Sequence, residues 1–198
     1  MISIKIISAI IAALIGIIAF LPYLKDIFYK KTKPHVYTWL IWTLTTGTGV
    51  FAIWYGSGGF GALNLTVGLI FIFVIFLFSL KYGTKDITKS DTIILFFAIC
   101  AILVWWQLNQ PLISIIMISV IDFLGYIPTF RKSYKQPWSE TLSSLMLFVI
   151  SDIFAIFALE SYNALTLTYL STITMANLFI FLICIFRRPH VKNPAIKF

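Results

Sequence analysis

Two aspartates inside long apolar segments are the residues best placed to do chemistry in this chain. Asp122 lies close to the middle of the apolar run 111–129, and Asp152 lies just past the middle of the run 141–159. A carboxylate at the centre of a bilayer costs about 2.5 kcal/mol or more. The apolar runs contain no Lys, Arg or His near their centres that could pair with either acid. Protonation, a bound cation or a cationic substrate would neutralise the acids; the structural alternative is a protonated aspartate that bonds Ser or Thr on a neighbouring helix.

Polar and aromatic residues at helical spacing could complete a binding site around these acids. Residues at i, i+3, i+4 and i+7 share one face of a helix. Such faces present Trp42, Thr46, Asp122, Tyr126, Asp152, Thr174 and Asn177. Together they predict a midplane pocket with aromatic walls and a few converging polar groups, as small-ligand sites have. The alternative is structural, because Thr permits close helix contact in lipid and Trp favours the interface. Asn64, at the start of the run 61–80, is predicted only to satisfy that helix end.

The composition indicates that these segments lie in lipid. Hydrophobic residues make up 60% of the 198 residues, charged residues 11%, and the mean hydropathy is +0.98. These values exclude a water-soluble domain. A bilayer core about 30 Å thick requires roughly 20 apolar residues per helix. Runs near that length lie at 3–24, 35–55, 61–80, 92–107, 111–129, 141–159 and 164–186. We therefore predict an all-α integral membrane protein with seven transmembrane helices, which we expect in a bacterial inner membrane.

The basic residues predict how the helices are oriented. Lys and Arg accumulate in cytoplasmic loops. All 15 basic residues except Lys5 fall after the first, third, fifth or seventh run. We therefore expect the N-terminus outside and the C-terminus in the cytoplasm. The net charge of +8 then faces anionic lipid headgroups and is poor support for nucleic-acid binding.

The second half of the chain repeats features of the first. Pro22 is matched by Pro128, Phe51-Ala52-Ile53 by Phe154-Ala155-Ile156, and Ala62-Leu63-Asn64-Leu65-Thr66 by Ala164-Leu165-Thr166-Leu167-Thr168. Three crossings per copy require one additional helix to restore the orientation, so the copies are parallel repeats. We predict repeat 1 at 1–84, connector helix at 85–110, repeat 2 at 111–188 and a cytoplasmic tail at 189–198. Gly16 aligns with Asp122 and Gly49 with Asp152, so the acids belong to one repeat only.

This plan resembles the SWEET and PQ-loop transporter superfamily. The resemblance lies in the order of three, one and three helices over about residues 3–188, and in a proline that closes the first helix of each repeat before a basic loop. The pairs here are Pro22-Tyr23 and Pro128-Thr129, which depart from the Pro-Gln motif. The resemblance implies alternating access with Pro22 and Pro128 as hinges. Each proline also removes a backbone donor, and the alternative is a static kink that ends a helix.

The resemblance implies a small-molecule substrate, and the residues modify that expectation. SWEET-like sugar transporters place an asparagine in the third helix of each repeat, and only Asn177 matches, with Ile75 in the first repeat. Two buried acids favour proton-coupled movement of a polar or cationic solute of the sugar, nucleoside or amino acid class. The alternative is a non-transporting receptor or partner-binding scaffold of the same fold. The oligomeric state is left open.

The chain lacks the sequence motifs of catalysis and of metal binding. Cys100 and Cys184 fall inside predicted helices without a CxxC pattern or a nearby histidine. His35 and His190 lie near the cytoplasmic ends, and neither HExxH nor GxSxG occurs. We therefore expect no enzymatic activity, no cofactor and no metal site.

Overall fold

The computed structural model describes residues 3–32, 34–83, 87–108 and 111–192, and these residues form seven α-helices. The helices are α1 (Ile4–Phe28), α2 (Val36–Tyr55), α3 (Ala62–Tyr82), α4 (Lys89–Leu108), α5 (Pro111–Lys135), α6 (Leu142–Phe157) and α7 (Ala164–Arg187). Short 3-10 helices lie at Gly59–Gly61, Pro137–Ser139 and Arg188–His190. The predicted all-helical class is confirmed for the described residues.

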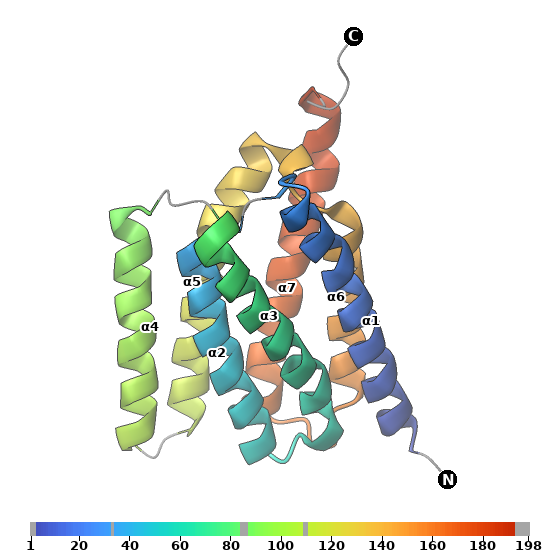
Figure 1. The fold of residues 1–198 in the computed structure, drawn as a ribbon. Helices are drawn as coiled ribbons and strands as arrows, with labels where there is room; N and C mark the ends of the chain where they lie inside the picture. The colour runs from blue at the N-terminus through green and yellow to red at the C-terminus, as the bar shows by residue number, and fades with distance from the viewer. Residues whose placement is uncertain (1–2, 33, 84–86, 109–110, 193–198) are drawn as a thin grey trace.

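The helices run side by side and alternate in direction (Figure 1). We call the end at which α1 begins the N-terminal end, and the end at which α7 finishes the C-terminal end. The turns from α2 to α3 and from α6 to α7 lie at the N-terminal end. The links from α1 to α2 and from α5 to α6 lie at the C-terminal end, where α4 also begins.

Four segments in the described part of the chain are long and apolar enough to cross a membrane. They are Ile4–Phe28, Val36–Tyr55, Gly59–Tyr82 and Ala164–His190, and Leu142–Phe157 is a shorter apolar helix. A helix rises 1.5 Å per residue, so about 20 residues span the bilayer core. These helices indicate a membrane protein.

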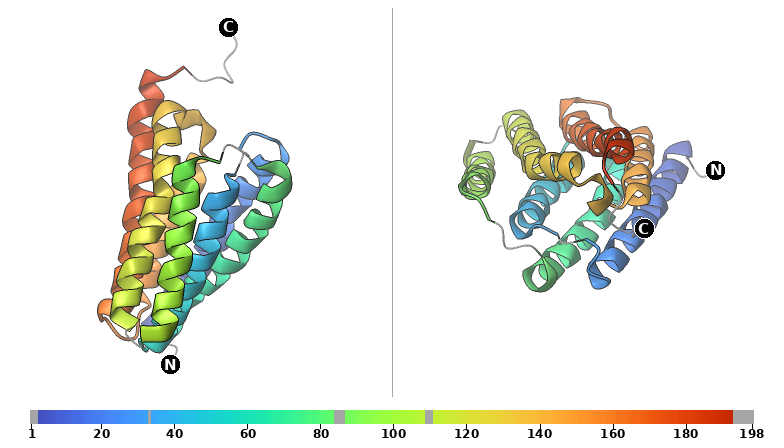
Figure 2. Two further views of the ribbon diagram at one scale, coloured as in Figure 1. Left: turned by 90° about the vertical axis from the view of Figure 1, so that its left-hand side faces the viewer. Right: turned by 90° about the horizontal axis from the view of Figure 1, so that it is seen from above.

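The two halves of the bundle use the same helix neighbours. In the first half α3 packs against both α1 and α2, and in the second half α7 packs against both α5 and α6. Between the halves, α1 packs against α6 and α2 packs against α5. Helix α4 lies at one edge of the bundle, against α5 and α2 (Figure 2).

Small residues allow α1 to approach α6 closely. The buried face of α1 carries Ala9, Ala12, Ala13, Gly16 and Ala19. Ser151 of α6 donates from Oγ to the carbonyl oxygen of Ala12 at 2.8 Å. Small side chains of this kind are typical of helix contacts in lipid, where packing and hydrogen bonds supply the attraction.

The two prolines lie inside their helices, so the prediction that they close them was wrong. Helix α1 continues past Pro22 to Phe28, and α5 continues past Pro128 to Lys135. A proline removes one donor but leaves the later turns free to form. Helix α1 ends instead where Lys30 adopts a left-handed φ of 57°. The side chain of Pro128 lies outside the described part of the chain.

Smaller differences concern other helix ends. Helix α4 begins at Lys89, before the apolar run at 92–107, because Asp91 in its first turn accepts from the backbone N–H of Thr88 at 2.8 Å. Helix α6 ends at Phe157, short of the predicted limit at 159.

Candidate functional site

Two adjoining cavities, which share four lining residues, lie between the halves of the bundle. The larger, about 640 Å³, has exposed residues of the C-terminal end on its rim, among them Lys30, Lys135 and Gln136. We call it the vestibule; His35, Thr88, Asp91, Lys132, Glu140 and Ser144 also line it. The smaller, about 100 Å³, is the inner cavity. The inner cavity is lined by Gly16, Phe20, Trp39, Trp42, Thr46, Asn64, Leu65, Gly68, Ile72, Asp122, Tyr126, Phe148, Ser151, Asp152, Ile173 and Asn177.

Four side chains line both cavities and so lie between them: Trp39, Trp42, Phe148 and Asn177. They come from α2, α6 and α7. A solute that enters the vestibule therefore meets three aromatic rings and one amide before it reaches the acids.

Most residues that the sequence predicted for the pocket line the inner cavity. These are Trp42, Thr46, Asp122, Tyr126, Asp152 and Asn177. Thr174 does not line either cavity; its Oγ1 donates to the carbonyl oxygen of Leu170 at 2.7 Å. The placement of Thr174 in the pocket was therefore wrong, because a threonine can satisfy its hydroxyl on the preceding turn of its own helix.

Asp122 joins three helices at the inner cavity. Its side chain, 1% exposed, comes from α5. The Oδ1 atom accepts a hydrogen bond from Thr45 Oγ1 of α2 and lies 3.3 Å from the Tyr169 hydroxyl of α7. The same hydroxyl is 3.1 Å from Thr46 Oγ1. Asp122 Oδ2 is buried and has no hydrogen-bond partner among the described residues.

Asp152 belongs to a second chain of hydrogen bonds. Its Oδ2 accepts from Asn177 Nδ2 at 2.9 Å. Asn177 Oδ1 in turn accepts from the Tyr126 hydroxyl at 3.2 Å. This chain connects α6, α7 and α5. Asp152 is 5% exposed, so water reaches little of its carboxylate.

Positive charge is found in the vestibule and not beside the two inner acids. In the described part of the chain, ion pairs join His35 Nε2 to Asp91 Oδ2 at 3.6 Å and Lys132 Nζ to Glu140 Oε1 at 2.8 Å. All four of these residues line the vestibule. The two inner acids are therefore buried without a compensating charge among the described residues.

Aromatic rings form one wall of the inner cavity. The ring centroids of Trp42 and Tyr126 are 4.6 Å apart, and those of Trp39 and Trp42 are 5.1 Å apart. Trp39 is only 6% exposed, which disfavours a role as an anchor at the membrane surface. Trp42 Nε1 is buried and lacks an acceptor within the described part of the chain.

Asn64 is a cavity residue that the sequence assigned to another role. It is 7% exposed, lines the inner cavity and accepts a hydrogen bond from Ser151 Oγ at 3.0 Å. The prediction that it only satisfies a helix end was therefore wrong. Gly16 provides the room, since a Cβ atom there would lie 2.8 Å from Asn64 Oδ1. In the sequence, Gly16 stands where the second repeat has Asp122, and this difference could have drawn attention to the space that Asn64 fills.

Tyr169 was missed altogether, and it is fully buried. A Cβ atom on Gly49 would come within 2.5 Å of its ring. The absence of a side chain at Gly49 therefore lets Tyr169 cross toward α2 and reach Asp122. The alignment of Gly49 with Asp152 drew attention to Gly49, but the sequence did not indicate that the ring of Tyr169 fills the space beside it.

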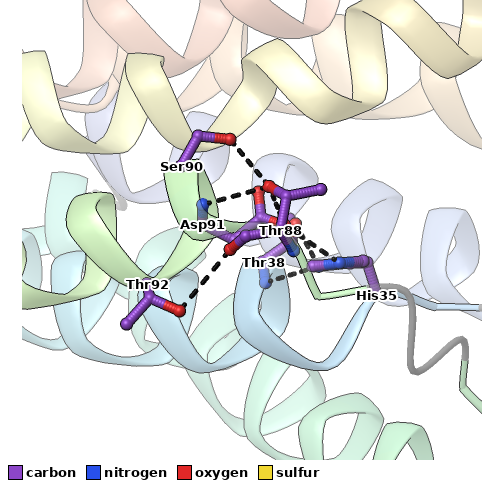
Figure 3. Close-up of polar contacts among 6 residues, drawn as sticks. All are labelled: His35, Thr38, Thr88, Ser90, Asp91 and Thr92. Carbon is purple, nitrogen blue, oxygen red and sulfur yellow. Dashed lines mark hydrogen bonds and ion pairs between the residues drawn. The ribbon is translucent and has the colours of Figure 1, made fainter.

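The vestibule wall contains a polar cluster that ties α2 to α4 (Figure 3). His35 Nδ1 accepts from the backbone N–H of Thr38 at 3.4 Å and so caps α2. Asp91 Oδ2 accepts from both the backbone N–H and the hydroxyl of Thr88, at 2.8 and 2.7 Å. The His35–Asp91 pair connects these caps, which fixes the start of α4 beside the start of α2.

The N-terminal end of the bundle is held shut by contacts between the halves. Asn163 Nδ2 donates to the carbonyl oxygen of Gly56 at 2.9 Å, and the backbone N–H of Glu160 donates to that of Gly58 at 3.2 Å. Lys5 Nζ donates to the carbonyl oxygen of Glu160 at 3.2 Å. The turn from α6 to α7 is thus joined to the turn from α2 to α3 and to the start of α1.

No protein-family model matches the chain, and neither a characterised protein nor a solved structure matches it. The resemblance to the SWEET and PQ-loop superfamily stays a prediction.

Proposed function

We propose that this protein is a membrane transporter that moves a small polar or cationic solute by alternating access. The observation that carries the proposal is the adjoining pair of cavities, which share four lining residues. A wide vestibule at the C-terminal end leads past Trp42 and Asn177 to a buried cavity with two acids, while the N-terminal end is closed. This is the arrangement of a transporter that is open to one side only.

The proposal takes all seven helices to cross the bilayer, as two parallel repeats with α4 as connector. Equivalent helix neighbours in the two halves support this arrangement. The proposed orientation places the C-terminal end in the cytoplasm, since the basic residues Lys30, Lys31, Arg131, Lys132 and Lys135 all line the vestibule there. The chain would then be open to the inside.

The proposed hinges are the prolines of α1 and α5. Pro22 lies between Phe20, which lines the inner cavity, and Tyr23, which lines the vestibule. Without the N–H of Pro22, the carbonyl of Ile18 lacks its usual helical donor, and a bend there costs less than elsewhere. Bending at Pro22 and Pro128 would narrow the vestibule while the N-terminal end opens.

Protons are the proposed coupling ion. Asp122 and Asp152 are buried, and each bonds to a neutral partner, Thr45 or Asn177. A proton on either acid would remove its charge without changing its size. Loading and release of a proton could therefore alternate with substrate binding at the same cavity.

A second function, a receptor that binds without transporting, is favoured by one observation: the vestibule rim belongs to one end of the bundle only. A receptor needs access from one side, whereas a transporter must expose the inner cavity to both. Access to Thr46, which lines the inner cavity, separates the two.

The experiment replaces Cys100 and Cys184 by Ala and introduces Thr46→Cys. Membrane-impermeant thiol reagents are then applied to oriented vesicles from each side. Ser57→Cys, exposed at the N-terminal end, and Lys135→Cys, exposed at the C-terminal end, serve as markers of sidedness. A transporter labels at position 46 from both sides, more slowly through the N-terminal end. Labelling only from the side that labels Lys135→Cys would contradict transport and support the receptor.

A further inference from the structure

The two acids of the inner cavity have no resident counter-charge. Neither Asp122 nor Asp152 takes part in an ion pair among the described residues. A sugar or another neutral solute could accept and donate hydrogen bonds here but could not supply positive charge. A cationic solute supplies it directly, and an anion would be repelled.

Two unpartnered atoms belong to residues that line the cavity, and they further restrict the solute. Asp122 Oδ2 is buried and receives no hydrogen bond, so it requires a donor. Trp42 Nε1 is buried and finds no acceptor in the described part of the chain, so it requires an oxygen or nitrogen lone pair. A quaternary ammonium has no N–H to donate to Asp122 Oδ2. A hydrocarbon amine has no oxygen to accept a hydrogen bond from Trp42 Nε1.

The wall and the size of the cavity point to a compact group. The rings of Trp42 and Tyr126 present aromatic faces, which attract a cation. The volume of about 100 Å³ is below the roughly 150 Å³ of an engineered cavity that holds benzene. Any longer part of the solute would extend past Trp39 and Phe148 into the vestibule.

We propose that the inner cavity selects the protonated primary amine of a small solute that carries an oxygen acceptor a few atoms away. The ammonium donates to Asp122 and Asp152, and the oxygen accepts from Trp42 Nε1. This inference rests on the proposed transport function and names its substrate class. Protons and the amine compete for the same carboxylates, so acidification weakens amine binding.

An inorganic cation is the main competing occupant. The described residues contain no cluster of three or more His, Cys, Asp or Glu side chains that could hold a metal ion. Sodium chloride is nevertheless the necessary control in the binding experiment, because it tests this occupant directly.

The test measures thermal stabilisation of the detergent-purified protein by ethanolamine hydrochloride, with sodium chloride at equal ionic strength and ethylene glycol as controls. Ethylene glycol replaces the ammonium by a hydroxyl and otherwise has the same shape. A bound solute stabilises by an amount set by its concentration relative to its dissociation constant. We expect a saturable shift with ethanolamine, at least about tenfold weaker apparent binding of ethylene glycol and of choline, and weaker ethanolamine binding at lower pH.

Variants locate the site. Asp122→Asn keeps the acceptor for Thr45 and removes the charge, and we expect at least about a tenfold loss of ethanolamine affinity. Trp42→Phe keeps a ring and removes the donor, with a loss of a few fold expected. Asp26→Asn is the matched control, because Asp26 lines neither cavity and its bond from Thr141 survives in an amide; its affinity stays within about twofold.

The wild-type comparison decides the inference even if Asp122→Asn fails to fold. No saturable shift with ethanolamine, an equal shift with ethylene glycol, or an equal shift with sodium chloride overturns it. Failure of the amine together with two-sided labelling of Thr46→Cys leaves transport standing and makes the substrate neutral or inorganic. One-sided labelling overturns transport itself, whichever solute binds.

Discussion

The two ends of the bundle differ in which parts of the chain their polar contacts join. At the N-terminal end, Asn163, Glu160 and Lys5 bond across the boundary between the halves. At the C-terminal end, many contacts stay within the second half, as in Lys132 to Glu140 and Arg188 to the carbonyl oxygen of Glu140.

The bonds between the halves at the C-terminal end lie on the α1–α6 side. Thr141 Oγ1 donates to Asp26 Oδ2 at 2.6 Å, and Thr32 Oγ1 lies 3.5 Å from the carbonyl oxygen of Ser139. The vestibule opens beside these bonds, since Ser139 and Thr141 are among the residues that line it. Both ends therefore have hydrogen bonds between the halves, but at the C-terminal end the vestibule also leaves space between them.

The strength of the hydrogen bonds at the N-terminal end determines how readily this end could open. A neutral hydrogen bond contributes about 1 kcal/mol and one to a charged group about 1.5–3 kcal/mol. The few bonds at the N-terminal end thus amount to a few kcal/mol, a range in which a second conformation can be populated at 0.1–10%. Under the proposed transport function, solute binding at the inner cavity would shift this equilibrium.

Locking the closed end should have the largest effect. A Cβ atom on Gly56 would lie 3.0 Å from Leu165 Cβ, close to the 3.5–4.5 Å of a disulfide. In a background without Cys100 and Cys184, we expect Gly56→Cys with Leu165→Cys to cross-link on oxidation. The bond should slow labelling of Thr46→Cys from the N-terminal side by about 100-fold or more, since about 2.7 kcal/mol corresponds to that factor.

Reduction should restore the labelling rate, which separates a lock from damage. Each single cysteine variant is the matched control and should respond to neither oxidant nor reductant. Unchanged labelling in a fully cross-linked protein would mean that the N-terminal end does not open at the contact between these turns.

The next effect concerns the tyrosine that lies between the two ends. Gly49→Ala places a Cβ atom 2.5 Å from the Tyr169 ring, and overpacking of this kind costs about 1–3 kcal/mol. We expect a lower melting temperature and a weakened contact between Tyr169 and Asp122. Gly47→Ala on the same helix is the control, because its Cβ atom would meet only Leu69 at 3.9 Å. Equal melting temperatures for the two variants would contradict the tight passage at Gly49.

The sequence predicted the helices better than the details of the site. Each apolar run overlaps a helix of the described residues, and α7 at Ala164–Arg187 agrees closely with 164–186. The ends of α1 and α5 were wrong because a proline was taken as a terminus. Whether a helix resumes after a proline depends on the packing of its later turns, as at Ile27, which is fully buried.

Helical periodicity also predicted most of the residues that line the inner cavity, since residues on one face of a helix stay on that face however the helix packs. It could not find Tyr169 or Asn64. Their roles depend on space left by Gly49 and Gly16 on other helices, which is a property of the packed bundle. Thr174 failed for the opposite reason, because its hydroxyl is satisfied within its own helix.

A smaller effect is expected from the basic residue at the closed end. Lys5 Nζ donates to the carbonyl oxygens of Leu159 and Glu160. Because Lys5 is only partly buried, its loss should weaken closure by about 1.5 kcal/mol, the low end of the range for charged groups. We expect Lys5→Met to raise labelling of Thr46→Cys from the N-terminal side about tenfold. Lys5→Arg keeps the donors and should label near the wild-type rate; equal rates for Met and Arg would assign Lys5 no part in closure.

The smallest effect comes from a single neutral bond, and a pair of variants isolates it. Asn163 Oδ1 caps α7 by accepting from the backbone N–H groups of Leu165 and Thr166, while its Nδ2 donates to the carbonyl oxygen of Gly56. Asn163→Asp keeps the cap and loses the bond across the closed end, so labelling of Thr46→Cys from that side should rise about fivefold for a loss of about 1 kcal/mol.

Asn163→Ala loses both functions of the side chain. It should show the same faster labelling together with a lower melting temperature, because an N-cap contributes about 1 kcal/mol. If the aspartate variant labels at the wild-type rate while the alanine variant is destabilised, Asn163 serves only to start α7. Closure of the N-terminal end would then depend on Lys5 and on the backbone bond from Glu160 to Gly58.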